Sequence, residues 1–225
     1  MVDELVGLSA THAILEYCAG GSLDYHLACL RKKKKGSKSF SYDTEDWVGM
    51  GEELAAPLVR QMADGLDHLH RLGVAHRDMK PANVLFFDAA RTTLKICDFG
   101  FAIRCANNKL KDRLGTLFYK APELCAVNAR GSGYLGRPVD MWALGAIVYE
   151  MLHCRAAFHG NTEQDIEIRI CQPSGFHDLR KSLSPAAKAL IQALLTQDVA
   201  KRLGAADVLA HGWILAHNSK PSPLA

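Results

Sequence analysis

The most regular hydrophobic pattern in the sequence runs from Glu53 to Leu72, where apolar residues recur every three or four positions. They are Leu54, Leu58, Met62, Leu66 and Leu69. This spacing places the apolar side chains on one face of a helix, so the pattern predicts an amphipathic helix packed on a core. Gly73 follows directly and is expected to end that helix.

A second apolar stretch, from Met141 to Tyr149, has no polar face and is bounded by Asp140 and Glu150. A helix that is apolar on all sides lies inside a protein or a membrane. This stretch is far shorter than the roughly 18 residues that a membrane span needs. We therefore expect a buried helix over residues 139–152.

Shorter patterns predict the remaining elements. A β-like run at 11–17 leads into the turn sequence CAGGSL, and a helix is expected from Ser22, as its cap, to Leu30. Two short strands are expected at 83–87 and 93–97, and further helices near 185–195 and 205–215. The predicted fold class is mostly α with a few short β strands (α+β).

One segment has a strongly biased composition. It is RKKKKGSKSFSYDTED, residues 31–46, basic at its start and acidic at its end. We expect a solvated loop here, within an insertion at 31–52. A nuclear-import or nucleic-acid patch at Arg31–Lys35 is the alternative. The net charge of the chain is only +3, which is too small to favour nucleic acid as a partner.

The bulk composition favours one domain or one lobed unit, since 225 residues can bury one substantial core. The seven cysteines are odd in number and show no CxxC pairing. This usage favours a reducing, intracellular compartment, cytoplasmic or nuclear. The first residues, MVDELVGLSA, lack the basic and apolar blocks of a signal peptide, and no membrane partner is expected. The sequence gives no indication of oligomeric state.

Candidate chemistry is concentrated in the segment VAHRDMKPANVLF, residues 74–86, and in KICDFGFA, residues 95–102. Asp78 and Asp98 supply carboxylates, and Asn83 supplies an amide oxygen. Such oxygens suit Mg²⁺, which binds one or two carboxylates together with phosphate oxygens. Lys80 would neutralise a transferring phosphoryl group, and a free carboxylate would accept a hydroxyl proton.

Five ordered motifs resemble those of the large lobe of eukaryotic protein kinases. They are HRDMKPAN (76–83), DFG (98–100), GTLFYKAPE (115–123), DMWALG (140–145) and an arginine at 202. The resemblance covers roughly residues 5–215. It implies a remnant of small-lobe strands and hinge at 1–21, a large lobe at 22–219 and a tail at 220–225.

The resemblance implies transfer of the γ-phosphate of Mg-ATP to a protein hydroxyl and gives roles to particular residues. Asp78 would be the base, Lys80 the γ-phosphate contact, and Asn83 and Asp98 the magnesium ligands. The adenine would meet Leu85, the hinge backbone of Glu16 and Cys18, and Leu15 as gatekeeper. Structural roles would fall to His76, Phe99 and Gly100, to Asp140, and to the pair Glu123–Arg202.

Lys80 and Gly115–Thr116 resemble serine/threonine kinases, in which Thr116 would hydrogen-bond Asp78 and Lys80. The protein partner is therefore expected to carry a serine or threonine. The other interpretation is a non-catalytic kinase-like module, in which the polar cluster survives without turnover and the lobe binds partners.

Protein kinases place a glycine-rich loop, a strand lysine and a helical glutamate before the hinge. Only fifteen residues precede Glu16 here, and they contain none of the three. The sequence GSGYLG, residues 131–136, matches GxGxxG but follows the APE motif, so we expect a surface linker there. Residues 1–225 alone are expected to have weak or no activity. Either the natural product begins upstream of Met1, or the chain is a catalytic remnant.

Two expectations concern specificity and control. Kinases that prefer upstream arginine carry acids at three places, which hold Ser22, Ala82 and Glu150 here, so no strong arginine preference is expected. Between Phe101 and Gly115 there is no Ser, Thr or Tyr to phosphorylate. We hypothesise that Asp112 supplies a fixed negative charge to Arg77 instead, with Arg104 as a second cation. A solvated surface aspartate is the alternative.

Overall fold

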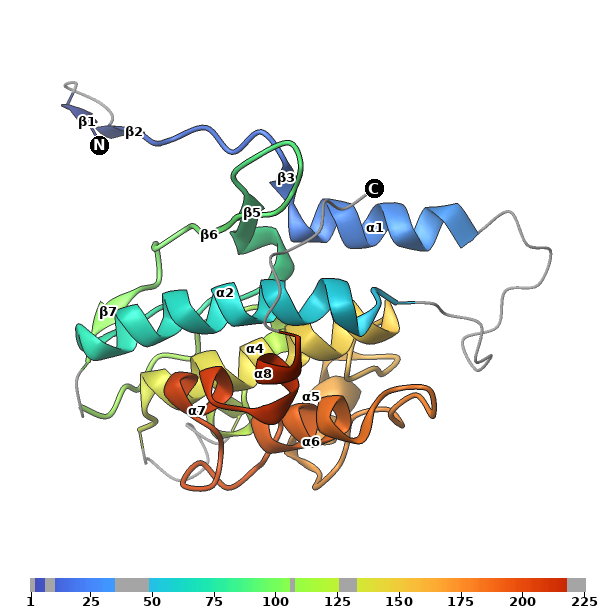
Figure 1. The fold of residues 1–225 in the computed structure, drawn as a ribbon. Helices are drawn as coiled ribbons and strands as arrows, with labels where there is room; N and C mark the ends of the chain where they lie inside the picture. Colours follow the sequence, from blue (N-terminus) through green and yellow to red (C-terminus); the bar gives the residue numbers. More distant parts are fainter. Residues whose placement is uncertain (1–2, 7–10, 35–48, 106–107, 126–132, 218–225) are drawn as a thin grey trace.

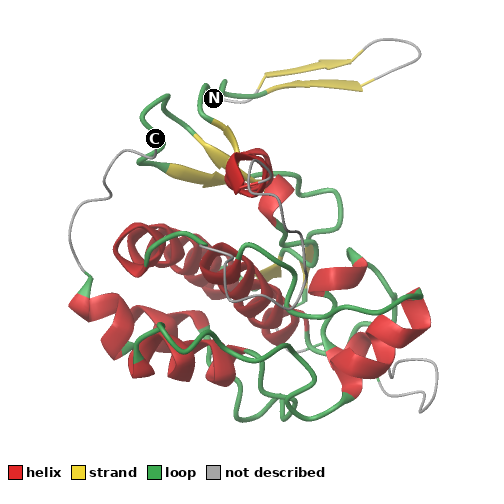
Figure 2. Ribbon diagram, turned by 90° about the vertical axis from the view of Figure 1, so that its right-hand side faces the viewer, coloured by secondary structure: helices red, strands yellow, loops and turns green. Residues whose placement is uncertain are grey.

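A computed structural model describes residues 3–6, 11–34, 49–105, 108–125 and 133–217. The helices are α1 (Leu23–Lys34), α2 (Glu52–Arg71), α4 (Gly136–His153), α5 (Glu163–Cys171), α6 (Pro185–Leu194), α7 (Ala205–Leu209) and α8 (Gly212–Ala216). Short 3-10 turns, η1 (Pro81–Asn83) and η2 (Leu117–Tyr119), lie in the connecting segments. Helices α2 and α4 to α8 are packed together in the lower part of Figure 1, β7 (Ile103–Arg104) lies beside one end of α2, and the other labelled strands lie above these helices together with α1 (see also Figure 2). The expectation of a mostly α fold is confirmed.

Helix α2 crosses the middle of the molecule, where the 3.6-residue pattern predicted it (Figure 1). Its apolar face is buried; Leu58, Met62 and Leu66 are at most 1% exposed. Burying side chains of this size contributes about 1.5–3 kcal/mol each. Gly73 follows with φ of +74°, a left-handed conformation that glycine adopts without steric cost, so the predicted stop is confirmed.

Glu52, at the N-terminus of α2, contacts the helices α6 and α8 near the C-terminus. Its carboxylate accepts hydrogen bonds from the Ser184 amide (2.7 Å), the Ser184 hydroxyl (2.6 Å) and the Trp213 indole (2.7 Å). Burial alone would raise the pKa of Glu52, but these bonds outweigh it and lower the pKa. Glu52 therefore joins α2, α6 and α8 as an ionised carboxylate.

Helix α4 is buried along almost its whole length, as its continuous apolar pattern predicted. Trp142 stacks on Phe158 with ring centroids 5.6 Å apart. The helix begins earlier than expected, at Gly136, where an added Cβ would lie 2.6 Å from the Cβ of Ala75. The described part of the GSGYLG segment is therefore packed rather than a surface linker, with Tyr134 4% exposed. Gly131 lies outside the described residues.

The strands form three small antiparallel sheets. Strands β1 (Asp3–Val6) and β2 (Thr11–Ile14) form a hairpin, and β4 (Val74–Ala75) pairs with β7 (Ile103–Arg104). In the third sheet β5 (Val84–Phe86) lies between β3 (Gly21–Ser22) and β6 (Leu94–Ile96). Leu85 faces Ser22 and Lys95 in this register. The loop from Ala75 to Asn83 thus leaves one small sheet and enters another, which fixes both of its ends.

Several element boundaries differ from the sequence expectations. The predicted strand at 11–17 ends at Ile14, and the helix predicted near 205–215 is divided into α7 and α8. Helix α1 begins after Ser22, whose hydroxyl accepts from the Tyr25 amide at 3.1 Å, so the predicted cap is confirmed. The helix continues to Lys34, because lysine and arginine favour helices and suit the negative end of the helix dipole.

The basic half of the 31–46 segment is therefore not a solvated loop: Arg31 to Lys34 are helical, and residues 35–48 lie outside the described residues. In the described part of the chain, no helix combines the length and the apolar character that crossing a bilayer requires.

Candidate active site

The loop between β4 and η1 is held from below by the buried carboxylate of Asp140 on α4. One oxygen accepts from the Arg77 amide at 2.7 Å, and the other accepts from the His76 amide at 2.9 Å. His70, on α2, adds a contact from its Nε2 at 2.9 Å. Arg77 has φ of +67°, which is strained for a residue with a long side chain. The bonds from the two loop amides to Asp140 help to offset this strain.

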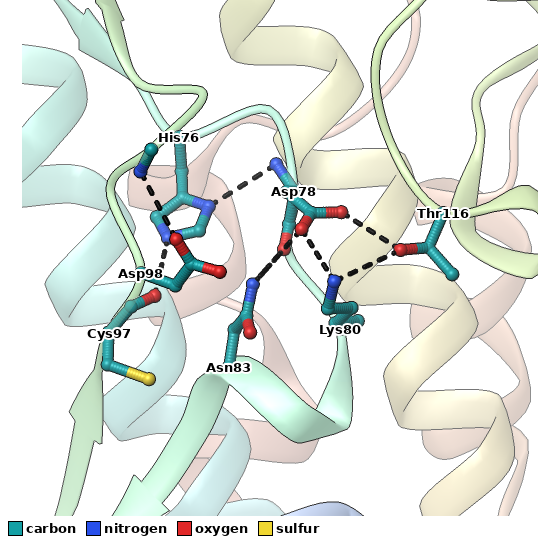
Figure 3. Close-up of polar contacts among 8 residues, drawn as sticks. His76, Asp78, Lys80, Asn83, Cys97, Asp98 and Thr116 are labelled. Carbon is teal, nitrogen blue, oxygen red and sulfur yellow. Dashed lines mark hydrogen bonds and ion pairs between the residues drawn. The ribbon is translucent and has the colours of Figure 1, made fainter.

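Asp78, Lys80 and Thr116 converge in one hydrogen-bonded cluster (Figure 3). The Lys80 ammonium lies 2.6 Å from one carboxylate oxygen of Asp78 and 3.2 Å from the Thr116 hydroxyl. Thr116 donates to the other carboxylate oxygen at 3.0 Å. Asp78 is 5% exposed, so these bonds fix a carboxylate that water reaches poorly. The contacts predicted for Thr116 are present.

Asn83 joins the same cluster from the end of η1. Its amide nitrogen donates to the Asp78 carbonyl at 2.9 Å and to the Asp78 carboxylate at 3.3 Å. Because both bonds use the nitrogen, the amide oxygen is left to accept or to ligate. The position of Asn83 on the 3-10 turn that follows Pro81 thus orients an oxygen donor beside Asp78.

Asp98 lies two residues beyond the end of β6 and has φ of +60°, a conformation that aspartate tolerates better than most residues. One carboxylate oxygen accepts from the Gly100 amide at 3.2 Å. The other points toward Asn83 and Asp78 (Figure 3). The two predicted carboxylates and the amide therefore face a common space, although they come from segments separated by a strand hairpin.

His76 links the two acid-bearing segments. Its Nδ1 accepts from the Asp78 amide at 3.3 Å, so Nε2 carries the proton and donates to the Cys97 carbonyl at 3.0 Å. The Phe99 ring packs edge-on against the imidazole with centroids 5.1 Å apart. The predicted contact between His76 and Phe99 is present, and it fixes Asp98 relative to Asp78.

The donor set of this cluster fits a hard cation next to phosphate. Asn83 contributes an amide oxygen and Asp98 a carboxylate oxygen on the side where the two face each other. Mg²⁺ is commonly held by one or two protein oxygens and completes its shell with water and phosphate. Among the residues that the structure describes, no group of three or more His, Cys, Asp or Glu side chains is placed so that it could hold a metal ion.

The structure places Asp112 beside Arg77, as hypothesised. The Arg77 guanidinium lies 3.3 Å from the Asp112 carboxylate and 3.3 Å from the Tyr134 hydroxyl, and it donates to the Phe101 carbonyl at 2.7 Å. Arg77 is buried, whereas the Asp112 side chain is 61% exposed. The contact is thus a solvent-facing one, and a role for it stays a prediction. Among described residues, Arg104 is exposed and makes no contact with Asp112.

Glu123 and Arg202 form a bidentate ion pair with N–O distances of 2.7 and 3.0 Å. The Arg202 side chain is fully buried, donates to the carbonyls of Thr196 and Pro138, and lies 5.0 Å above the Trp142 ring. The structural role expected for this pair fits its geometry, since it ties the segment after Thr116 to α4.

The residues expected to meet adenine come from two places, the segment that holds Leu15, Glu16 and Cys18, and strand β5, which holds Leu85. Leu15 is 64% exposed, and Glu16 pairs with Lys95 of β6 at 3.2 Å. Burial, then the nearby charges of Asp98 and Cys18, raise the pKa of Cys97. Cys18 thus lies near the segment that carries Asp98. Leu85 is half-buried on β5. Their contact with a nucleotide stays a prediction.

Sequence reasoning missed three partners in and around the site. They are His70 on Asp140, Tyr134 on Arg77, and a trio in which Glu150 binds both Arg31 and Tyr119. Each of these contacts joins residues more than thirty positions apart in the sequence. Glu150 had been singled out for its charge, but its two partners had not. The hydrophobic and polar patterns of single segments give no information about such contacts, because the contacts depend on how distant elements pack together.

Comparison with known proteins agrees with the geometry. Residues 8–214 match the protein kinase domain. A calcium and calcium/calmodulin-dependent serine/threonine-protein kinase of rice (Oryza sativa subsp. japonica) is 33% identical over 97% of this chain and 39% of its own length. Calcium-dependent protein kinase 19 of rice is 32% identical over 96% of the chain and 37% of its own length.

An Aurora kinase of Dictyostelium discoideum is 34% identical over 81% of the chain and 45% of its own length. The chain thus spans less than half the length of these relatives. The match covers the loop with Asp78, the Asp98 segment and the Glu123–Arg202 pair, and the chain belongs to the protein kinase family.

Proposed function

We propose that this chain is the large lobe, residues 22–219, of an ATP-dependent protein kinase that phosphorylates serine or threonine. The observation that carries the proposal is the single hydrogen-bonded cluster of Asp78, Lys80, Asn83 and Thr116, with Asp98 directed at it. One of the relatives named above is a serine/threonine-protein kinase by name, and the other two are named as a protein kinase and an Aurora kinase. These names support the same activity.

Each side chain of the cluster has a task in such a transfer. The carboxylate of Asp78 orients the substrate hydroxyl and accepts its proton as the oxygen attacks phosphorus. The Lys80 ammonium, 2.6 Å from Asp78, faces the same point and balances negative charge on the transferring group. Thr116 keeps both groups in register by bonding to each.

Asn83 and Asp98 would hold magnesium. When bound, the metal neutralises charge on the phosphates and orients the terminal one. The chain's part is to present two oxygens from two segments that His76 holds together. The ATP requirement follows from the family, and the choice of magnesium rests on this oxygen-only donor set.

We further propose that the site does not select arginine upstream of the target residue. Glu150 is the one acid at the three places that favour basic substrates, and it is 4% exposed. Its carboxylate already binds the Arg31 guanidinium and the Tyr119 hydroxyl, the latter at 2.6 Å. An incoming arginine would have to displace Arg31. A peptide array dominated by upstream arginine would overturn this proposal, whereas Arg31→Ala should introduce that preference.

The pair Arg77–Asp112 is proposed as a constant substitute for a phosphorylated residue. A carboxylate carries one charge against about −1.5 to −2 for phosphate, so the clamp is weaker but always present. Asp112→Asn should lower turnover without changing thermal stability, because Asp112 is a solvent-facing partner. Equal turnover with and without Asp112→Asn, measured in a protein that carries a complete small lobe, would contradict the clamp.

Residues 1–225 alone are proposed to turn over slowly, since no glycine-rich loop or strand lysine precedes Glu16 within them. Removing one preorganised donor costs about 10²- to 10³-fold in rate. The experiment compares residues 1–225 with a fusion that adds the small lobe of the calcium and calcium/calmodulin-dependent kinase of rice. For each protein, phosphate transfer from labelled ATP to serine, threonine and tyrosine peptides is measured.

The proposed kinase requires that the fusion phosphorylate serine or threonine peptides at least about 100-fold faster than residues 1–225. Asp78→Asn in the fusion should abolish this transfer. A fusion that binds ATP but transfers nothing would favour the alternative, a non-catalytic kinase-like module that binds partners.

A further inference from the structure

A cavity of about 260 Å³ lies between the C-terminal end of α2, the first turns of α4 and the segment that leads into α7. Helices α2 and α7 pack against each other beside it (Figure 1). Its walls include three arginines, Arg71, Arg137 and Arg202, and one carboxylate, that of Asp67. Among the described residues that line the cavity, none belongs to the polar cluster around Asp78. The cavity is therefore separate from the site proposed for phosphate transfer.

Two of these arginines already have partners. Arg202 binds both carboxylate oxygens of Glu123 and donates to two backbone carbonyls, so its charge is neutralised. Arg71 lies 2.9 Å from Asp67, and the Arg71 side chain is 70% exposed. An ion pair that is so open to water contributes little to stability. The Arg71 guanidinium can therefore turn from Asp67 to another anion at little cost.

Arg137, the second residue of α4, has no such partner. Its Nε is buried and has no hydrogen-bond partner among the residues that the structure describes. Within that part of the chain, no carboxylate forms an ion pair with its guanidinium either. A buried donor that lacks an acceptor is costly, and a water or an ion commonly supplies the missing partner. The cavity thus has a wall with an unneutralised positive charge.

The chemistry of the cavity favours a phosphate group as the ligand. A guanidinium binds phosphate through two parallel N–H···O bonds. The first turn of α4 contains no acidic side chain, and the positive end of the helix dipole adds to the charge of Arg137. Pockets for drug-sized ligands measure about 300–1,000 Å³. A cavity of about 260 Å³ therefore suits a phosphate group with few further atoms, not a whole nucleotide.

We propose that this cavity is a phosphate-binding site in which Arg137 and Arg71 hold the anion. Arg137 supplies the unneutralised guanidinium, and Arg71 turns from Asp67 to the ligand. His70 also lines the cavity, and its Nε2 lies 2.9 Å from Asp140, which accepts from both amides of the catalytic loop. A phosphate bound here thus lies beside the residues that support that loop. The phosphate is either free or carried by a phosphorylated serine, and its binding does not depend on phosphate transfer.

The test is a titration of isotope-labelled residues 1–225 with sodium phosphate at constant ionic strength, followed by amide chemical shifts. Saturable shifts are expected at Arg137 and at residues 204–206, which line the cavity. Arg137→Gln should raise the dissociation constant at least about tenfold, because a charged donor is lost. Ala206→Glu should do the same by repulsion. Ala206 is exposed in the first turn of α7, where an acidic side chain favours the helix, so this variant keeps the fold.

Two control variants separate this cavity from other basic groups. Arg60→Gln is the matched control, because the Arg60 Nε is also buried without a partner in the described chain, but Arg60 does not line the cavity. Lys80→Ala removes the cation of the polar cluster around Asp78. Both variants should bind phosphate with unchanged affinity. Circular dichroism of each variant confirms that a lost shift reflects the missing group and not an unfolded chain.

A serine phosphopeptide and its unphosphorylated form distinguish the two sources of the phosphate. Tighter binding of the phosphopeptide than of free phosphate identifies a phosphorylated protein as the ligand, whereas binding of free phosphate alone identifies a small molecule. Three results would overturn the proposal. They are the absence of saturable shifts at the cavity, equal affinity with and without Arg137→Gln, and a loss of binding in Lys80→Ala that Arg137→Gln does not show.

Discussion

Replacement of Asp140 by alanine tests what holds the catalytic loop. Asp140 is fully buried and accepts from the His76 amide, the Arg77 amide and the His70 ring at 2.7–2.9 Å. Each buried donor that loses its partner costs about 1–3 kcal/mol. Relaxation of Arg77 from its left-handed conformation returns about 1–3 kcal/mol. We therefore expect Asp140→Ala to lower the free energy of unfolding by about 3–5 kcal/mol, as for other broken buried charge networks.

The measurement is urea unfolding followed by the fluorescence of Trp142 and Trp213, both buried. Asp67→Ala is the matched control, because Asp67 pairs with Arg71 four positions on, and the Arg71 side chain is 70% exposed, so the pair is open to solvent. Its loss should cost at most about 0.5 kcal/mol. If Asp140→Ala costs less than about 1 kcal/mol, similar to the control, the carboxylate does not hold the loop and the reasoning is refuted.

Further predictions concern the buried ion pair and the histidines. Glu123→Gln should destabilise the chain by about 3–5 kcal/mol in urea, since it leaves the buried Arg202 charge without its bidentate partner; a loss below about 1 kcal/mol would contradict this. Burial lowers the pKa of His153 and His177 to about 4, and the Nε2 of His153 accepts from the Arg180 amide, which a protonated ring cannot do. As the pH falls, these histidines take up protons in the unfolded chain before they do so in the folded chain, because their pKa is lower in the folded chain. The free energy of unfolding should therefore be highest above pH 6.5 and fall as the pH drops from 6.5 to 4. A urea midpoint that does not change between pH 7 and pH 5 would refute this prediction.

The sequence predicted the parts of the site that lie close together along the chain. Asp78, Lys80 and Asn83 share one loop, so their spacing alone brings them near each other, and the turn at Pro81 completes the arrangement. Asp98 was found because it ends a short strand before a glycine. The long helices α2 and α4 were predicted because burial on one face, or on all faces, leaves a strong periodic pattern.

The parts that were missed depend on packing between distant elements. Nothing near Arg31 in the sequence indicates that α1 continues through the lysines and carries Arg31 to Glu150. The link from Tyr134 to Arg77 likewise needs the packed start of α4. The division of the last helix into α7 and α8, near His211, follows a local backbone change that no apolar pattern shows.

The central claim is that Asn83 and Asp98 hold the magnesium of Mg-ATP beside Asp78 and Lys80. The most direct test is the thermal unfolding midpoint of residues 1–225 at fixed ATP as magnesium is raised. A ligand that binds only the folded chain raises the midpoint. The account predicts a magnesium-dependent rise that Asp98→Asn removes and that the surface variant Asp67→Ala retains. A rise that is the same without magnesium, or that Asp98→Asn leaves intact, would contradict it.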